Sequence, residues 1–127
     1  DLIVDAEEPT TRAYKRADVV RTHVFDGLQD LFAEYDLLVT ATLGTTAFPH
    51  GEEPESIDGV DIEPLRGWVL TQPYNFTGHP AASVPAGFAD GLPVGMQIAG
   101  QRHDDDVVLA ASAAFERQRP WHDEYPA

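Results

Sequence analysis

The sequence predicts an α/β fold in which two amphipathic helices flank a short strand and a β-hairpin. Two observations support this prediction. Apolar residues recur at helical spacing near both ends of the 127-residue chain. Between these regions, glycines and prolines punctuate two apolar segments that surround the turn dipeptide Asp90–Gly91. Three strands and two large helices make a thin layer, which would cover one face of a sheet better than it would close a core alone.

The first expected element is a long amphipathic helix over residues 10–35. Its stripe repeats at alternating spacings of three and four residues. The stripe consists of Tyr14, Ala17, Arg21, Val24, Leu28, Leu31 and Tyr35. Thr10 or Thr11 can cap the N-terminus of this helix. Arg21 interrupts the stripe, and it either lays its stem across the core with its head in water or forms a buried ion pair.

A short strand, a loop and a short helix are expected next. Residues 37–40 are apolar without alternation, which favours a strand in the interior of a sheet covered by helices on both sides. Residues 43–61 are broken by prolines and glycines and rich in acids, so they predict a long loop. Residues 64–71 can form a short helix with Pro64 in its first turn.

An antiparallel hairpin is expected from residues 81–88 and 92–99, on either side of Asp90–Gly91. On its second strand, large residues share one face and small ones share the other, so a helix or a pocket wall can approach the small face closely. The small face consists of Pro93, Gly95, Gln97 and Ala99.

A final helix is expected to begin at Asp104–Asp106, with Val108, Ala111 and Phe115 as its apolar stripe. Acids at its start match the helix dipole, and Pro120 stops it.

The charge of the chain is strongly negative. It has 22 Asp and Glu residues against eight Lys and Arg, and its net charge is −14. Such a field repels phosphate, which argues against nucleic-acid binding. The acids are spread along the chain and Lys15 is its one lysine, a pattern that favours a high-salt cytoplasm over a localised acidic interaction surface.

The remaining composition predicts a soluble cytoplasmic protein that does not enter a membrane. The chain has no cysteine and no apolar run near the ~20 residues that span a bilayer. Its first residues lack the basic and apolar regions of a signal peptide. Whether the chain forms homo-oligomers stays open.

Three segments, read in order, closely resemble the C-terminal part of the amidase signature family. They are EYDLLVTATLGTTAF at residues 34–48, NFTGHPAASVPAGF at 75–88 and GLPVGMQIAG at 91–100. The resemblance implies that residues 1–127 are a partial amidase domain, with a mixed sheet covered by helices. It also implies hydrolysis of a carboxylic amide by a Ser–cisSer–Lys triad, in an N-terminal region that has no match in this sequence.

No residue of the chain is therefore a candidate for the catalytic triad, and the chain alone is expected to be inactive. Ser56, Ser83 and Ser112 stand apart from any serine-rich segment, and Ser83 is interpreted as an ordinary strand residue. Lys15 is interpreted as a solvated charge. The histidines lack metal-binding spacing, so we expect no metal ligand, and the resemblance implies no metal or organic cofactor.

Four residues are candidates for substrate binding, namely Trp68, Tyr74, Phe76 and Gly78. The three aromatics could form an apolar wall for the amide, or they could be core residues. The resemblance implies an aspartate near position 68 in the A subunits of tRNA amidotransferases, so Trp68 favours a general amidase. Gln97 either bonds to a loop or supports the amide pocket. His79 stands where the family usually has a smaller apolar residue.

Two partners follow from the resemblance, a small-molecule amide and the N-terminal remainder of the amidase fold. One alternative is that the chain is a non-catalytic remnant that binds a partner through an exposed sheet edge. A further alternative is that the chain is part of the A subunit of a tRNA-dependent amidotransferase.

Overall fold

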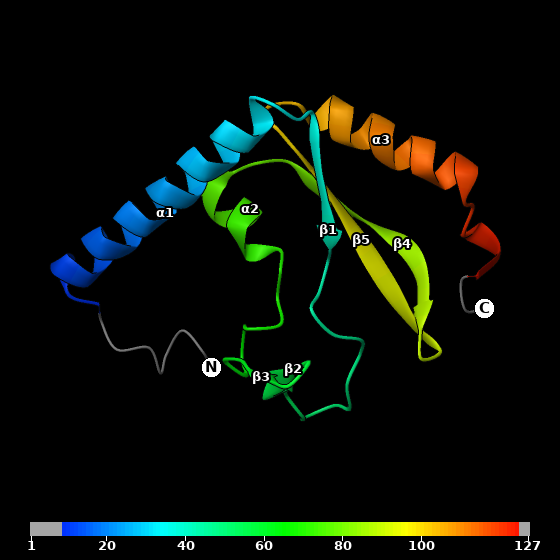
Figure 1. The fold of residues 1–127 in the computed structure, drawn as a ribbon, viewed down its shortest axis with the longest axis horizontal. Coiled ribbons are helices and arrows are strands. Elements are labelled where there is room, and N and C mark those ends of the chain that lie inside the picture. Colours follow the sequence, from blue (N-terminus) through cyan, green and yellow to red (C-terminus); the bar gives the residue numbers. More distant parts are fainter. Residues whose placement is uncertain (1–8, 125–127) are drawn as a thin grey trace.

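The computed structural model describes residues 9–124 and has the expected α/β arrangement (Figure 1). Two long helices, α1 and α3, diverge from one end of a small sheet, and a short helix α2 lies beside α1. In chain order the elements are α1 (Thr11–Phe32), β1 (Leu37–Ala41), β2 (Ser56–Ile57), β3 (Val60–Asp61), α2 (Gln72–Thr77), β4 (Ala81–Ala89), β5 (Leu92–Gly100), α3 (Asp105–Gln118) and a 3₁₀ turn (His122–Glu124).

The main sheet has three strands in the order β1-β5-β4, and both pairings are antiparallel. Strands β4 and β5 form the predicted hairpin. Asp90 and Gly91 occupy its turn with φ of 52° and 78°, the left-handed conformation that a two-residue hairpin loop requires. A bulge between Pro85 and Gly87 shifts the register between β4 and β5 from Gly87 onward.

Different elements pack on the two faces of the main sheet. Helix α3 packs on one face, where an added Cβ at Gly100 would lie 2.8 Å from Val108 Cγ2. On the other face, Ala99 is fully buried in a cluster with Phe32 and Tyr74. The alternation predicted for the second hairpin strand is therefore confirmed, because the consecutive residues Ala99 and Gly100 of β5 contact different elements on opposite faces of the sheet.

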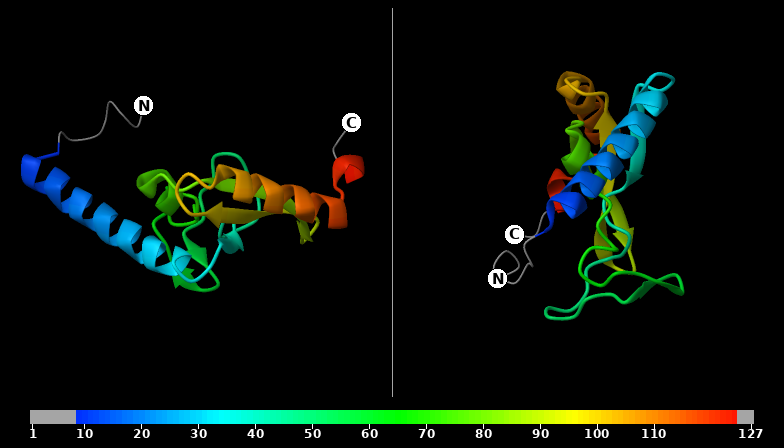
Figure 2. Two further views of the ribbon diagram at one scale, coloured as in Figure 1. Left: turned by 90° about the horizontal axis from the view of Figure 1, so that it is seen from above. Right: turned by 90° about the vertical axis from the view of Figure 1, so that its left-hand side faces the viewer.

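Helix α1 begins as predicted but ends at Phe32 rather than Tyr35. Thr10 is its cap, and the Thr10 hydroxyl accepts a hydrogen bond from Ala13 N at 3.2 Å. The end of α1 joins the core, whereas its first half projects away from the sheet (Figure 2). Tyr14, predicted as part of the buried stripe, is 62% exposed.

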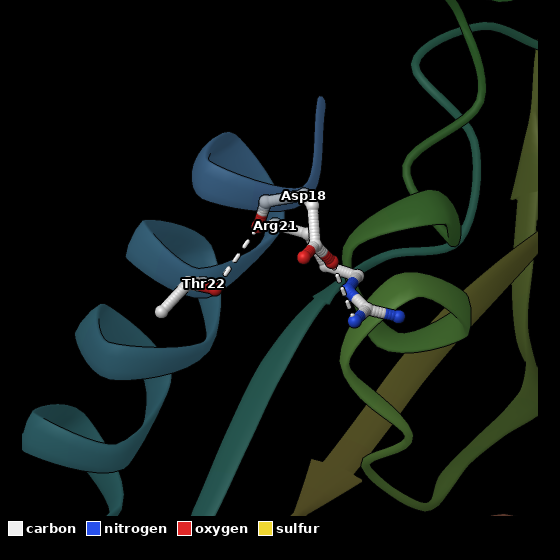
Figure 3. A network of polar contacts seen from close by, with 3 residues as sticks. All are labelled: Asp18, Arg21 and Thr22. Atoms are coloured by element: carbon white, nitrogen blue, oxygen red, sulfur yellow. Dashed lines mark hydrogen bonds and ion pairs between the residues drawn. The ribbon is translucent and has the colours of Figure 1, made fainter. Parts of the chain in front are cut away.

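Arg21 follows the first of its two interpretations, because its head is on the surface. Its Nη2 donates to Asp18 Oδ1 at 2.8 Å, and both side chains are substantially exposed (Figure 3). Exposed pairs of this kind contribute little to stability. The alternative of a buried ion pair is wrong.

Two expectations for the central part need correction. Strand β1 lies at an edge of this sheet rather than in its interior, and Val39 is 54% exposed. The short helix expected at 64–71 is a tight turn instead, because the Glu63 carboxylate accepts hydrogen bonds from Leu65 N and Arg66 N. The helix in this region is α2, which starts only at Gln72.

The loop expected at 43–61 contains a small two-stranded sheet, β2–β3, that the sequence did not predict. Asp58 and Gly59 form its turn with φ of 50° and 75°. None of the helices in residues 9–124 has the length and apolar character to cross a membrane.

Candidate functional site

A groove lined by hydroxyl groups runs along β1, the loop that follows it and the β4–β5 hairpin. It encloses about 840 Å³. The loop contributes Thr42, Thr45 and Thr46, β4 contributes Ser83, and β5 contributes apolar groups such as Met96. Such a surface offers both hydrogen bonding and apolar contact to a small molecule.

The centre of this groove is a close hydroxyl pair. Thr42 Oγ1 and Ser83 Oγ are 2.7 Å apart. The pair lies above Gly95, where an added Cβ would be 2.7 Å from Thr42 Oγ1 and 2.8 Å from Ser83 Oγ. The predicted close approach to the small face of the hairpin is thus made here by two side-chain oxygens, and Gly95 is the residue that permits it.

Gln97 ties the sheet to the segment at residues 68–70. Its side chain is 2% exposed, and its Nε2 donates to Thr40 Oγ1 at 3.2 Å and to Leu70 O at 3.4 Å. This confirms the interpretation of Gln97 as a hydrogen-bonding partner of a loop. A second bond fixes the same segment, since Gly44 N donates to Trp68 O at 2.8 Å.

Trp68 is not among the residues that line the hydroxyl-lined groove, but its carbonyl bonds to Gly44, which does line it. Its indole is half-buried and donates from Nε1 to Pro64 O at 2.9 Å. The ring of Phe48 meets it edge-on, with centroids 5.1 Å apart. Trp68 is therefore held in one orientation by its backbone, its ring nitrogen and an aromatic neighbour.

Tyr74 is a core aromatic, with 7% of its surface exposed in the cluster with Phe32 and Ala99. Burial raises the pKa of the Tyr74 phenol, and a hydrogen bond with Thr40 acts in the opposite direction. Thr40 is also the residue that accepts a hydrogen bond from Gln97, so the Tyr74 phenol and the Gln97 amide both lie near Thr40.

Phe76 and Gly78 lie elsewhere, on the side of α1. Phe76 is 55% exposed and lines an apolar groove between α1 and α2. Gly78 ends α2 with φ of 72°, and both residues line a small cleft with Arg21 and Arg102. The four predicted substrate-binding residues therefore do not line one cavity.

Sequence reasoning missed the hydroxyl pair of Thr42 and Ser83, together with Thr45 and Thr46. The run of threonines in TATLGTT was the available signal. The prediction of Ser83 as a strand residue is confirmed, because it lies in β4, but Ser83 also lines the groove.

Known proteins match both the sequence and this geometry. The family model described as Amidase matches residues 3–109. This chain belongs to the amidase signature family. The family prediction from the three motifs is confirmed, and so is the predicted fold class. An acylamidase of Rhodococcus erythropolis is 41% identical over 130 residues, which cover 100% of this chain and 27% of that protein.

Two further amidase signature relatives show how much of the family fold is present. The A subunit of a glutamyl-tRNA(Gln) amidotransferase from Streptococcus equi subsp. zooepidemicus is 39% identical, over 89% of this chain and 22% of that protein. The crystal structure of a bacterial aryl acylamidase matches with a TM-score of 0.84 and 44% identity, covering 91% of this chain and 25% of that one. The chain spans about a quarter of the length of these relatives, which agrees with the predicted C-terminal segment.

His79 is a buried polar residue of this amidase segment, with 5% of its surface exposed. Its Nδ1 lies 2.8 Å from Thr77 Oγ1 and its Nε2 lies 3.2 Å from Gln29 Oε1. The ring packs between Phe25 and Phe32. Burial, and then the positive charge of Arg102, lower the pKa of His79. A smaller apolar residue at this position would leave Gln29 without this link, so the histidine serves to attach α1 to the start of the hairpin.

Within residues 9–124, no cluster of three or more histidines and acids is placed to hold a metal ion. The hydroxyl of Ser83 is paired with another hydroxyl, and a threonine is not a base that could activate it. This surface can bind a molecule through hydrogen bonds and through its shape, but it offers no reactive group.

Proposed function

We propose that this chain is the C-terminal segment of a hydrolase that converts a carboxylic amide to an acid and ammonia or an amine. The rest of the amidase fold would supply the serine nucleophile, its activating residues and the oxyanion-binding groups. No metal or organic cofactor takes part in this scheme. The hydroxyl-lined groove above Gly95 carries the proposal, because it combines hydrogen-bonding groups with apolar side chains and provides no nucleophile of its own.

In this proposal the groove is one wall of the amide-binding site. The hydroxyls of Thr45 and Thr46 would face the polar part of the substrate. Trp68, whose carbonyl bonds to the groove residue Gly44, would contact its acyl or amine group. Tyr74 would hold the wall in place through Thr40. Phe76 and Gly78 remain proposed contacts for larger substrates on the side of α1.

A second candidate is a segment of a tRNA-dependent amidotransferase, which the 39% identity to the A subunit of such an enzyme supports. The indole at position 68 favours the general amidase, because it presents an apolar surface and no carboxylate. The two candidates differ in substrate and agree in the type of chemistry.

Trp68→Ala in the full-length enzyme tests the proposal. A wall that selects by shape discriminates by about 1–3 kcal/mol per methylene-sized difference, so relative kcat/KM for small and bulky amides should shift by roughly 10- to 200-fold at most. Trp121→Ala is the matched control, because Trp121 packs on Phe115 at the end of α3, with centroids 6.2 Å apart.

Three results would change this interpretation. Equal loss on every amide by a folded Trp68→Ala enzyme would make Trp68 a core residue. Glutaminase activity gained in Trp68→Asp would favour the amidotransferase. The isolated 127-residue chain should show no turnover, and turnover that Ser83→Ala abolished would identify a nucleophile in this segment.

A further inference from the structure

The hydroxyl-lined groove has no charged residue among the described residues that line it. Charged residues make up 24% of the chain, and its net charge is −14. Within residues 9–124, the groove is nevertheless lined only by threonine, serine, glycine and apolar residues. Two other cavities differ, because the cleft at the end of α2 includes Arg21 and Arg102 and the cavity beside α3 includes Asp36 and Asp104. The lack of charge is therefore a property of this groove and not of the chain as a whole.

The Thr42 and Ser83 hydroxyls have hydrogen-bonding capacity left for a ligand. Each hydroxyl has one donor and two lone pairs, and the contact of 2.7 Å between them uses one proton and one lone pair. Neither hydroxyl has another hydrogen-bonding partner within the described part of the chain. One O–H donor and several lone pairs therefore remain free. Either oxygen can present the free donor, because either can donate in the mutual contact.

This combination complements an uncharged amide group. A carboxamide presents a carbonyl oxygen that accepts and an N–H that donates, so it can use both the free O–H and the free lone pairs. A carboxylate presents only acceptors, and an ammonium group presents only donors. Either ion would also lose part of its water in the groove without an opposite charge to replace it, which is costly.

We infer that the groove selects uncharged amides over amides that carry a charge on the part seated in it, and that Thr42 and Ser83 position the amide group. This inference rests on the proposed function, and it adds the substrate class and the residues that determine it. Met96 and the other apolar groups would contact the hydrocarbon part of the same molecule. The groove discriminates against cations as well as anions, whereas the net charge of the chain would repel only anions.

Three amides of similar shape test the inference by binding to the 127-residue chain. They are benzamide, its 4-carboxylate and its 4-trimethylammonium derivative. Nuclear magnetic resonance titrations would follow the backbone amides of Gly95 and Met96 in molar KCl, where the Debye length of about 3 Å largely screens the field of the whole chain. We expect benzamide to bind roughly tenfold more tightly than either ion, or better. An ion that binds as tightly as benzamide under these conditions would overturn the inference.

Substitutions that remove one hydroxyl each test the role of the pair. Thr42→Val and Ser83→Ala should each weaken the binding of benzamide roughly 3- to 12-fold, the effect of losing one hydrogen bond. Ser112→Ala is the matched control, because Ser112 Oγ donates to Val108 O at 2.8 Å within α3 and does not line the groove. The control should stay within about twofold of wild type. An equal loss in the control and in the two groove variants would overturn the role of the hydroxyl pair.

Adding a positive charge to the groove should reverse its preference. In Thr46→Lys at 0.15 M salt, the 4-carboxylate should bind about tenfold more tightly than it does to wild type, whereas the affinity for benzamide should change about twofold or less. Thr45→Lys repeats the test from the adjacent position, and circular dichroism checks that each variant is folded. Unchanged binding of the carboxylate to both folded variants would overturn the inference.

Turnover by the full-length enzyme is measured separately on the same three amides. Preferential binding of benzamide by the chain, without hydrolysis of any amide by the enzyme, would refute the proposed function and support the selectivity of the groove. Hydrolysis of all three amides with equal kcat/KM would refute the inference and leave the proposed function intact.

Discussion

A methyl group at Gly95 should destabilise the chain more than its small size suggests. In Gly95→Ala the new Cβ would lie 2.7 Å from Thr42 Oγ1, 2.8 Å from Ser83 Oγ and 3.2 Å from Thr42 Cβ. Real Cβ atoms are not found at the two shorter distances, so the hydroxyl pair must separate or the strands must move. Overpacking of this kind costs about 1–3 kcal/mol, and the loss of one hydrogen bond adds about 0.5–1.5 kcal/mol.

Replacement of a strand glycine by alanine recovers about 0.5–1 kcal/mol, so we expect Gly95→Ala to lower the free energy of unfolding by about 1–4 kcal/mol in total. For a chain of 127 residues this corresponds to a fall of roughly 4–16 °C in Tm. Thermal and urea unfolding followed by circular dichroism would measure it. Gly27→Ala is the matched control, because nothing lies within 4 Å of its added Cβ and the site is in α1. That control should stabilise the chain by about 0.5–1 kcal/mol.

A double-substitution cycle separates the hydroxyl contact from general crowding. Ser83→Ala removes one of the two oxygens that an alanine at position 95 would meet. The penalty of Gly95→Ala should therefore shrink by about 1 kcal/mol in the Ser83→Ala background. A penalty below about 0.5 kcal/mol in the wild-type background, or one that Ser83→Ala leaves unchanged, would refute the tight hydroxyl pair.

Two further predictions concern salt and pH. The net charge of −14 should make Tm rise between low salt and molar KCl, and a Tm that stays flat or falls would remove the support for salt adaptation. Acid should destabilise the chain through His79, because burial and then Arg102 lower its pKa below the ordinary value of about 6.5. The unfolded chain then binds the proton more readily, so stability present above about pH 6.5 is lost as the pH falls below it. His79→Gln should reduce this loss relative to wild type and the exposed control His23→Gln, and identical pH profiles for all three would contradict the assignment.

The hairpin and the last helix could be predicted from the sequence because their signals are local. Asp90–Gly91 specifies a turn that needs two left-handed residues, and the alternation along β5 specifies its two faces. Pro120 and the acids of Asp105 and Asp106 mark the ends of α3. Each of these signals acts within a few residues of the feature it predicts, so the prediction does not depend on knowing a distant contact.

The predicted site was less accurate because the same residue type serves different purposes. An aromatic side chain has the same sequence signature in a core, in a half-buried contact with another ring and on an open surface. Tyr74, Trp68 and Phe76 occupy these three environments in turn. The turn at residues 64–68 replaces the start of the predicted helix for a related reason. Pro64 can start a helix, but the Glu63 carboxylate and the Trp68 indole bond to the same short stretch of backbone and close it after one turn.

The face of α1 and the strand β1 are both more exposed than the sequence predicts, and the cause is the same. The stripe of α1 predicted a covered helix face, and the apolar run at Leu37–Thr40 predicted a strand covered on both sides. Tyr14 and Val39 are nevertheless 62% and 54% exposed. A hydrophobic pattern records that a face is buried in the folded protein, but it does not record which part of the protein buries it. Both patterns would fit a larger fold, in which other parts of the protein cover these residues of α1 and β1.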